Sequence, residues 1–132
     1  MIQQLHKQSA MDKHTPVILV IEDDDSIGTF LVEALSQETP YKAILVTDGF
    51  QALQLMDKVK PCLFITDYHL PHMNGLELYD MLQLMQPLKD TPAILMSAQL
   101  PEQEVQKRNM VGLNKPFELD ELLDTVERLL AA

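Results

Sequence analysis

Short apolar runs alternate with segments of helical periodicity along most of the chain. The first run, VILVI at 17–21, is continuous and β-branched, which is typical of a strand covered on both faces. A helix is predicted next, which Asp25 or Ser26 can cap and which Pro40 ends. Its amphipathic stripe consists of Ile27, Phe30, Leu31, Ala34 and Leu35.

The same alternation continues to the C-terminus and predicts five strands and five helices. The strands are expected at 17–21, 42–46, 62–66, 93–96 and 111–113. The later helices are expected at 48–59, between Asn74-Gly75 and Pro87, at 101–110 and at 118–130. This pattern is typical of a parallel sheet with helices on both faces. Right-handed crossovers favour the strand order 2-1-3-4-5, which places the first and third strands side by side.

The N-terminal residues differ in character from the rest of the chain. Residues 1–16 are mostly polar and lack the apolar stretch of a signal peptide. We therefore expect 1–15 to be a flexible extension and 16–132 to form one domain. The apolar runs are too short to span a membrane, so a cytoplasmic protein is expected.

The chain is strongly acidic, with twenty Asp and Glu against ten Lys and Arg and a net charge of −10. Nucleic-acid binding requires clustered basic residues, and anionic membranes repel an acidic surface. Direct binding to nucleic acid or to a membrane is therefore disfavoured. An acidic excess remains compatible with cation binding.

Polar side chains follow the predicted strands at their carboxyl ends, where ligands bind in sheets of this kind. Glu22 and Asp23 follow the first strand, and Asp67 follows the third. Ser97 follows the fourth strand, and Lys115 comes shortly after the fifth. Three carboxylates in one pocket would repel and raise one another's pKa. A divalent cation relieves that repulsion, and oxygen ligands alone suit Mg²⁺.

A carboxylate flanked by Mg²⁺, a lysine and a hydroxyl is poised to receive a phosphoryl group as the nucleophile. Asp67 is the candidate, because a buried strand would hold it rigidly. Each residue alone also has a structural interpretation. Acids after strands cap helices or lie in turns, which we favour for Asp24 and Asp25. Ser97 alone is compatible with a turn and Lys115 alone with a solvent-facing side chain, but four strand ends converge.

These motifs resemble the receiver domains of two-component response regulators over about residues 16–130. The resemblance rests on VILVIEDD, FITDYHLPHMNGLEL, AILMSA and NKPF, in this order and at separations usual for the family. It implies a flavodoxin-like (βα)5 fold, a three-layer α/β sandwich. It also implies a phosphorylation-controlled signalling switch rather than an enzyme.

The resemblance implies a metal-binding role for four residues. Asp67 would be the phospho-acceptor and, with Asp23, a direct ligand of Mg²⁺. Glu22 would act through water, and His69 through its backbone carbonyl. The phosphoryl donor would be a phosphohistidine on a histidine kinase or phosphotransfer protein, and a downstream protein would be the target.

The resemblance also implies how the phosphoryl group is held. Ser97 would hydrogen-bond a phosphate oxygen, and Lys115 would pair with the phosphate. Pro116 would follow a cis peptide bond, which costs little before proline. Pro71 and Gly75 match the turn that follows the acceptor strand.

Two positions in receivers influence dephosphorylation through their side chains, and here they are His69 and Gln99. We expect both to affect the lifetime of the phosphorylated state. The pair His69 and His72 also has a spacing compatible with a transition metal. Because no cysteine or third histidine is near in sequence, exposed loop histidines are favoured over a zinc site.

The sequence departs from the family in one region. Receivers usually carry an aromatic residue three positions before the lysine, where this chain has Gly112. The segment from Ser97 to Lys115 is also about one helical turn shorter than is common, and the helix at 101–110 has few apolar anchors. We therefore expect an unusual or mobile region that phosphorylation orders. The alternative is that the shortening is drift and partners use the first helix.

Three functions compete on these grounds. The first is the phosphorylation-controlled switch, and the second is a pseudo-receiver that binds partners without phosphorylation. The third is a phosphohydrolase of the haloacid-dehalogenase type, disfavoured because such enzymes carry a second Asp where this chain has His69. The chain is compatible with a stand-alone receiver and with a fragment of a longer regulator.

Overall fold

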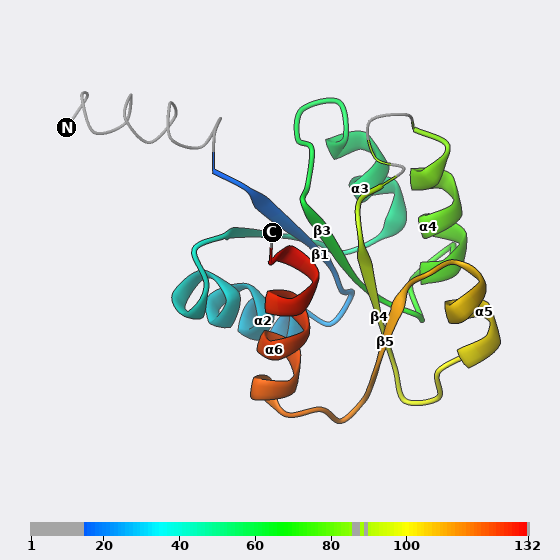
Figure 1. Ribbon diagram of the computed structural model, residues 1–132. Coiled ribbons are helices and arrows are strands. Elements are labelled where there is room, and N and C mark those ends of the chain that lie inside the picture. The colour runs from blue at the N-terminus through cyan, green and yellow to red at the C-terminus, as the bar shows by residue number, and fades with distance from the viewer. Residues whose placement is uncertain (1–14, 86–87, 89, 132) are drawn as a thin grey trace.

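Five parallel strands form one sheet (Figure 1). They are β1 (Val17–Ile21), β2 (Lys42–Val46), β3 (Leu63–Asp67), β4 (Ala93–Ser97) and β5 (Val111–Asn114). Their order is β2-β1-β3-β4-β5, which confirms the predicted order. The computed structural model describes residues 15–85, 88 and 90–131, so the predicted N-terminal extension lies outside the described residues except for Thr15.

The three central strands are buried along their whole length, because helices cover both faces of the sheet. β3 ends one residue later than predicted, so Asp67 is the last residue of the strand and not the first residue after it. The backbone of Asp67 therefore belongs to the parallel ladder and lies opposite Met96 of β4. The sheet itself fixes the direction of the Asp67 side chain.

The helices lie in two layers, one on each face of the sheet (Figure 1). They are α2 (Asp25–Glu38), α3 (Gly49–Leu55), α4 (Gly75–Gln83), α5 (Glu102–Lys107) and α6 (Leu119–Leu130). α2 and α6 pack with Ile18, Val20 and Ile65, whereas α3, α4 and α5 pack with Leu19, Ile21 and Phe64. Alternate strand residues thus face opposite layers, as the period of a strand requires. Within the described residues, no helix is long and apolar enough to cross a membrane.

The N-terminus of α2 is capped by Asp24, whose side chain accepts a hydrogen bond from Ile27 N at 3.0 Å. The predicted caps, Asp25 and Ser26, are therefore wrong, because both lie inside the helix. The interpretation of Asp24 as a capping residue is confirmed. Asp25 lies in the first turn, where its negative charge is favourable to the helix dipole.

The apolar stripe predicted for α2 is only partly buried. The buried residues of the helix are Gly28, Leu31, Ala34 and Leu35, whereas Ile27 and Phe30 are 40% and 54% exposed. Gly28 explains the difference, because a Cβ there would lie 2.6 Å from Leu45 Cδ1. The helix packs on the sheet through Gly28, and this orientation turns Ile27 and Phe30 towards solvent.

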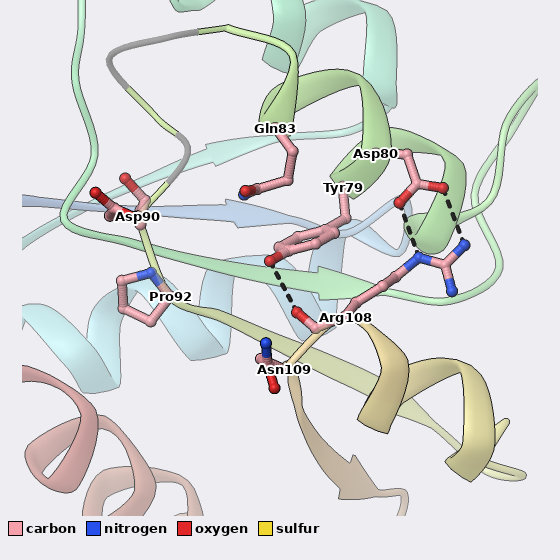
Figure 2. Close-up of a pocket in the computed structure, with 8 residues that line it drawn as sticks. Tyr79, Asp80, Gln83, Asp90, Pro92, Arg108 and Asn109 are labelled. Carbon is pink, nitrogen blue, oxygen red and sulfur yellow. Dashed lines mark hydrogen bonds and ion pairs between the residues drawn. The ribbon is translucent and has the colours of Figure 1, made fainter.

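α5 is shorter than the predicted helix at 101–110 and is fastened to α4 at its C-terminal end (Figure 2). Arg108 donates from Nε and Nη2 to the two carboxylate oxygens of Asp80, at 2.8 and 2.9 Å. The Tyr79 hydroxyl donates to the Arg108 carbonyl at 3.0 Å. The hydrogen bonds that Arg108 donates to the carboxylates of Asp80 and Glu104 raise its pKa. We call this set of contacts the Arg108 clasp; it supplements the few apolar anchors of α5.

We expect Phe64→Ala to lower the free energy of unfolding by about 3–5 kcal/mol, because it leaves a large cavity between β3 and the helices that cover it. Phe50→Ala is the matched control, since Phe50 is 52% exposed and should change stability by about 0.5 kcal/mol or less. Urea unfolding followed by circular dichroism measures both. Equal losses for the two variants would contradict the described core.

Candidate functional site

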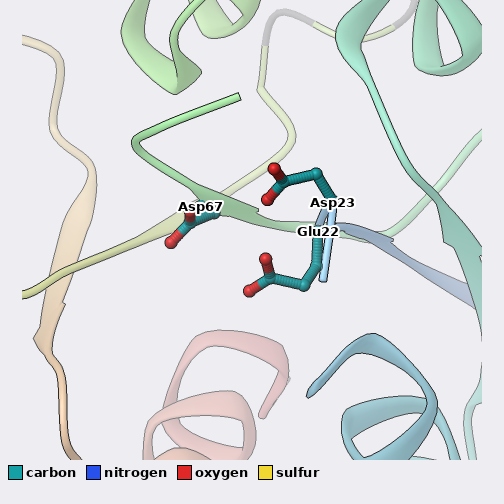
Figure 3. Close-up of side chains that lie close together, drawn as sticks. All are labelled: Glu22, Asp23 and Asp67. Carbon is teal, nitrogen blue, oxygen red and sulfur yellow. The ribbon is translucent and has the colours of Figure 1, made fainter. Parts of the chain in front are cut away.

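Three carboxylates converge where β1 and β3 end side by side (Figure 3). Glu22 and Asp23 directly follow β1, and Asp67 ends β3. One oxygen from each lies within 4.8 Å of those of the other two. The predicted convergence of Glu22, Asp23 and Asp67 is therefore present in the structure. It arises from the strand order, which makes β1 and β3 neighbours.

The three carboxylates differ in their exposure to solvent. Glu22 and Asp67 are buried, at 1% and 7% exposed, whereas Asp23 is exposed. Glu22 is held at both ends, because its backbone N–H donates to the Val46 carbonyl and its Oε2 accepts from Asp24 N. The cluster thus has a buried floor and one solvent-facing wall. A ligand can enter from the side of Asp23.

The Lys115 ammonium neutralises part of this charge. Its Nζ lies 2.7 Å from Asp67 Oδ1 and 3.2 Å from Glu22 Oε1. The backbone N–H of Lys115 donates to the Ser97 carbonyl at 2.9 Å, and the Lys115–Pro116 peptide bond is cis, as predicted. Lys115 therefore joins the ends of β1, β3 and β5.

The pKa values show how closely these charges interact. Burial raises the pKa of Glu22, and the negative charge of Asp67 adds to the rise, while Lys115 opposes it. Burial alone lowers the pKa of Lys115, but the hydrogen bond to Asp67 and the charges of Asp67 and Glu22 outweigh it and raise that pKa. Lys115 therefore stays protonated beside the carboxylates at neutral pH.

The backbone of Gly75 lies very close to the backbone of Asp67. A Cβ on Gly75 would lie 2.5 Å from the Asp67 carbonyl oxygen, so only glycine fits there. The Gly75 N–H donates to the Tyr68 carbonyl at 2.8 Å. Asn74 caps α4 and forms a capping box with Glu77. The Asn-Gly pair thus turns the chain directly behind Asp67, at the place where the sequence predicted a turn.

Ser97 is the buried last residue of β4, the strand that neighbours β3 in the sheet. Its hydroxyl donates to the Gln99 carbonyl at 3.0 Å and accepts from the Gln99 N–H at 3.2 Å. Pro116 and the side chains of Gln99 and His69 are exposed near the same edge. The sequence did not predict the bonds between Ser97 and Gln99, since they join a strand end to its own turn and have no pattern signal.

The donor set fits a hard divalent cation. Three carboxylates within reach of one point offer oxygen ligands only, which is the chemistry that Mg²⁺ prefers. His69 and His72 do not belong to any such cluster among the described residues, and both are exposed. The favoured interpretation of them as exposed loop histidines is confirmed. The acidic cluster is therefore consistent with a metal site whose ligands are carboxylates and not histidines.

The comparisons with known proteins assign the family. The model of the response regulator receiver domain matches residues 18–127. The chemotaxis response regulator CheY4 of Vibrio cholerae has a similar structure, with a TM-score of 0.80 and 28% identity over 88% of this chain and 99% of that one. This chain therefore belongs to the receiver domains of response regulators, a class of two-component signalling domain and not of classical enzymes.

Two curated relatives show the range of proteins that contain this domain. Sporulation initiation phosphotransferase F of Bacillus subtilis is 28% identical over 117 residues, which are 86% of this chain and 92% of that protein. Hybrid signal transduction histidine kinase D of Dictyostelium discoideum is 27% identical over 132 residues. This chain spans only 8% of the length of that kinase. The domain thus occurs both in small proteins and within long ones.

We expect Lys115→Met to lower the free energy of unfolding of the magnesium-free protein by about 2 kcal/mol, because it leaves two buried carboxylates without their cation. The pKa of Glu22 should rise further, since the positive charge of Lys115 lowers it. Urea unfolding in a chelating buffer and carboxyl NMR titration measure the two effects.

The raised pKa of Lys115 sets the pH range of this effect. The stabilisation is fully present below pH 10.5, the ordinary pKa, and is lost as the pH rises through the raised value. Lys107→Met is the matched control, because Lys107 is exposed and pairs with the exposed Glu104. Equal losses of stability for the two lysine variants at neutral pH would show that the ion pairs of Lys115 stabilise the fold no more than an exposed ion pair does.

Proposed function

We propose that the chain is a phosphorylation-controlled signalling switch in which Asp67 accepts a phosphoryl group from a phosphohistidine. The observation that carries the proposal is the Lys115 ammonium, which lies 2.7 Å from Asp67 Oδ1 beside the acidic cluster. A carboxylate in this setting combines a nucleophile with a positive charge that can stabilise the incoming phosphoryl oxygens. Membership of the receiver family supports the same role.

The transfer follows from the groups present. An oxygen of Asp67 forms a new bond to phosphorus while the bond from phosphorus to the donor imidazole nitrogen breaks. The electron pair of the broken bond remains on that nitrogen, and the product is an aspartyl phosphate. Lys115 then pairs with a phosphoryl oxygen instead of the bare carboxylate. The Ser97 hydroxyl donates to a second phosphoryl oxygen.

Four residues would hold the metal. Asp23 and Asp67 would bind it directly, Glu22 would bind it through water, and the backbone carbonyl of His69 would complete the protein's share. When bound, Mg²⁺ supplies positive charge that offsets the charge of the phosphoryl oxygens. The exposed position of Asp23 leaves an entry path for both the cation and the donor.

The partners are proposed from the chemistry and from the relatives. The donor is a histidine kinase or a phosphotransfer protein, in keeping with the names of two of the relatives. A downstream protein reads the phosphorylated surface near β4 and β5. We further propose that residues 16–132 form the receiver domain, that 1–15 extend from it, and that it works in the cytoplasm.

A pseudo-receiver that works without phosphorylation is the second candidate. The observation that favours it is Gly112, which lies in β5 at the position where receivers usually carry an aromatic residue. The ion pairs of Lys115 with Asp67 and Glu22 favour the phosphorylated switch, because a module that only binds partners has no need of a lysine paired with two buried carboxylates. Phosphorylation of Asp67 decides between the two.

We expect one PO₃ unit to be added to the protein on incubation with acetyl phosphate and Mg²⁺, because the small phosphodonor can reach Asp67 without a kinase. Intact-mass spectrometry measures the adduct. Omission of Mg²⁺ and the variant Asp67→Asn should each reduce it at least about tenfold. Asp90→Asn is the matched control, since Asp90 is an exposed acid outside the cluster.

Two outcomes would count against the switch. An adduct of equal yield on Asp67→Asn would show that another residue is modified. No adduct under any condition, together with unchanged folding, would favour the pseudo-receiver.

We expect His69→Ala and Gln99→Ala to change the rate of dephosphorylation by about threefold or more, because both side chains lie exposed at the edge that the attacking water must cross. The decay of the phosphorylated protein, followed by intact mass after removal of the phosphodonor, measures the rate. Gln54→Ala on the exposed face of α3 is the control. Decay rates that match the control would refute this role.

A further inference from the structure

Leu100 occupies the space next to Gly112. A Cβ built on Gly112 would lie 2.7 Å from Leu100 Cδ1 and 3.1 Å from its Cδ2. Leu100 comes from the turn after β4, whereas Gly112 lies within β5, so the contact joins the turn to the edge strand. Glycine is what allows the leucine to lie there, and a larger residue at 112 would displace it.

Leu100 is also linked to Ser97 of the proposed phosphorylation site, because it directly follows Gln99, to which Ser97 is hydrogen-bonded. The two hydrogen bonds between Ser97 and Gln99 close the turn immediately before Leu100. One of them uses the hydroxyl hydrogen of Ser97, which is a single donor. If that hydrogen is donated to a phosphoryl oxygen, the Gln99 carbonyl loses its partner.

The two ends of α5 are held very differently. At its N-terminal end, Pro101 provides no side-chain cap. At its C-terminal end, the Arg108 clasp binds Asp80 and Tyr79 of α4 (Figure 2). A disturbance of the turn at 98–101 will therefore move the start of α5 more easily than its end.

We infer that Leu100, in place of an aromatic residue at 112, transmits a change in the hydrogen bonds of Ser97 to β5 and to the start of α5. The inference rests on the proposed function for the step in which Ser97 donates to the phosphoryl group. That step frees the Gln99 carbonyl and opens the turn at 98–101. Leu100 then leaves Gly112, and the surface that changes on phosphorylation is formed by residues 98–104 beside β5.

Charge contributes little to this link, since its members are a hydroxyl, a backbone amide and two apolar groups. It depends instead on contact, and contact can be broken by changing volume. Gly112→Ala should displace Leu100 without phosphorylation, because the added methyl group meets only the flexible end of the leucine. Leu100→Ala should break the link while leaving Asp67, Ser97 and Lys115 in place.

The first experiment uses the unphosphorylated protein. Ser97→Ala removes the bonds to Gln99, so the NMR signals of the Leu100 methyls and the Gly112 amide should shift. The chain offers a matched control in Leu45, which covers Gly28 in the same way but lies on β2, at the opposite edge of the sheet from β5. Leu45 and Gly28 signals should stay. Unshifted Leu100 and Gly112 signals would overturn the inference, whether or not the protein is phosphorylated.

The second experiment compares hydrogen exchange before and after treatment with acetyl phosphate and Mg²⁺. Wild type should change at residues 98–104 and much less at 105–110, which the Arg108 clasp holds. Leu100→Ala should lose at least half of that change while still taking up one PO₃ unit, and Leu45→Ala should keep it. Gly112→Ala should show part of the change without the phosphodonor.

The two experiments separate this inference from the proposed function. A full exchange response in Leu100→Ala would overturn the inference, even if Asp67 is phosphorylated normally. Failure of wild type to take up the PO₃ unit would contradict the proposed function instead. The NMR result on Ser97→Ala would then still decide whether Ser97 and Leu100 are linked.

Discussion

The site depends on one electrostatic constraint, which is that a single ammonium group pairs with two buried carboxylates. Glu22 and Asp67 lie in a setting where unpaired charge is costly, and Lys115 contacts both. Two negative charges against one positive charge leave the site anionic even before Asp23 is counted. The folded chain therefore attracts a cation, and this attraction comes from carboxylates at the ends of β1 and β3.

The order of the strands makes this constraint possible. Because β1 and β3 are neighbours and β4 separates β3 from β5, Lys115 must reach across the end of β4 to meet Asp67. The backbone bond from Lys115 to the Ser97 carbonyl holds the chain at that crossing. The same bond brings Ser97 next to the ion pairs. The Asp67 carboxylate, the Lys115 ammonium and the Ser97 hydroxyl are thus positioned by the sheet, and the helices mainly cover it.

The sequence predicted well the features that depend on the strands, and it predicted poorly the contacts made by turns. Continuous apolar runs predicted the strands, and right-handed crossovers predicted their order. Because parallel strands end at one edge, the order in turn placed Asp67 and Lys115 at the same edge of the sheet. The burial of α2 was misjudged, since the stripe pattern counts Ile27 as apolar but gives no weight to the close packing of Gly28 on Leu45. Contacts such as Leu100 on Gly112 have no periodicity, so no pattern could predict them.

The contact between Leu100 and Gly112 gives a physical reason for the glycine at a position where receivers usually carry an aromatic residue. A glycine in an edge strand weakens the strand unless something else fills the space, and here Leu100 fills it from a turn that Ser97 closes. The apolar group that covers β5 therefore belongs to the segment that responds to Ser97 and not to β5 itself. Movement of the turn would expose the strand edge, whereas an aromatic side chain on β5 would move and leave the turn to follow. The Arg108 clasp limits how far such a movement can spread, because it holds the C-terminal end of α5 against α4.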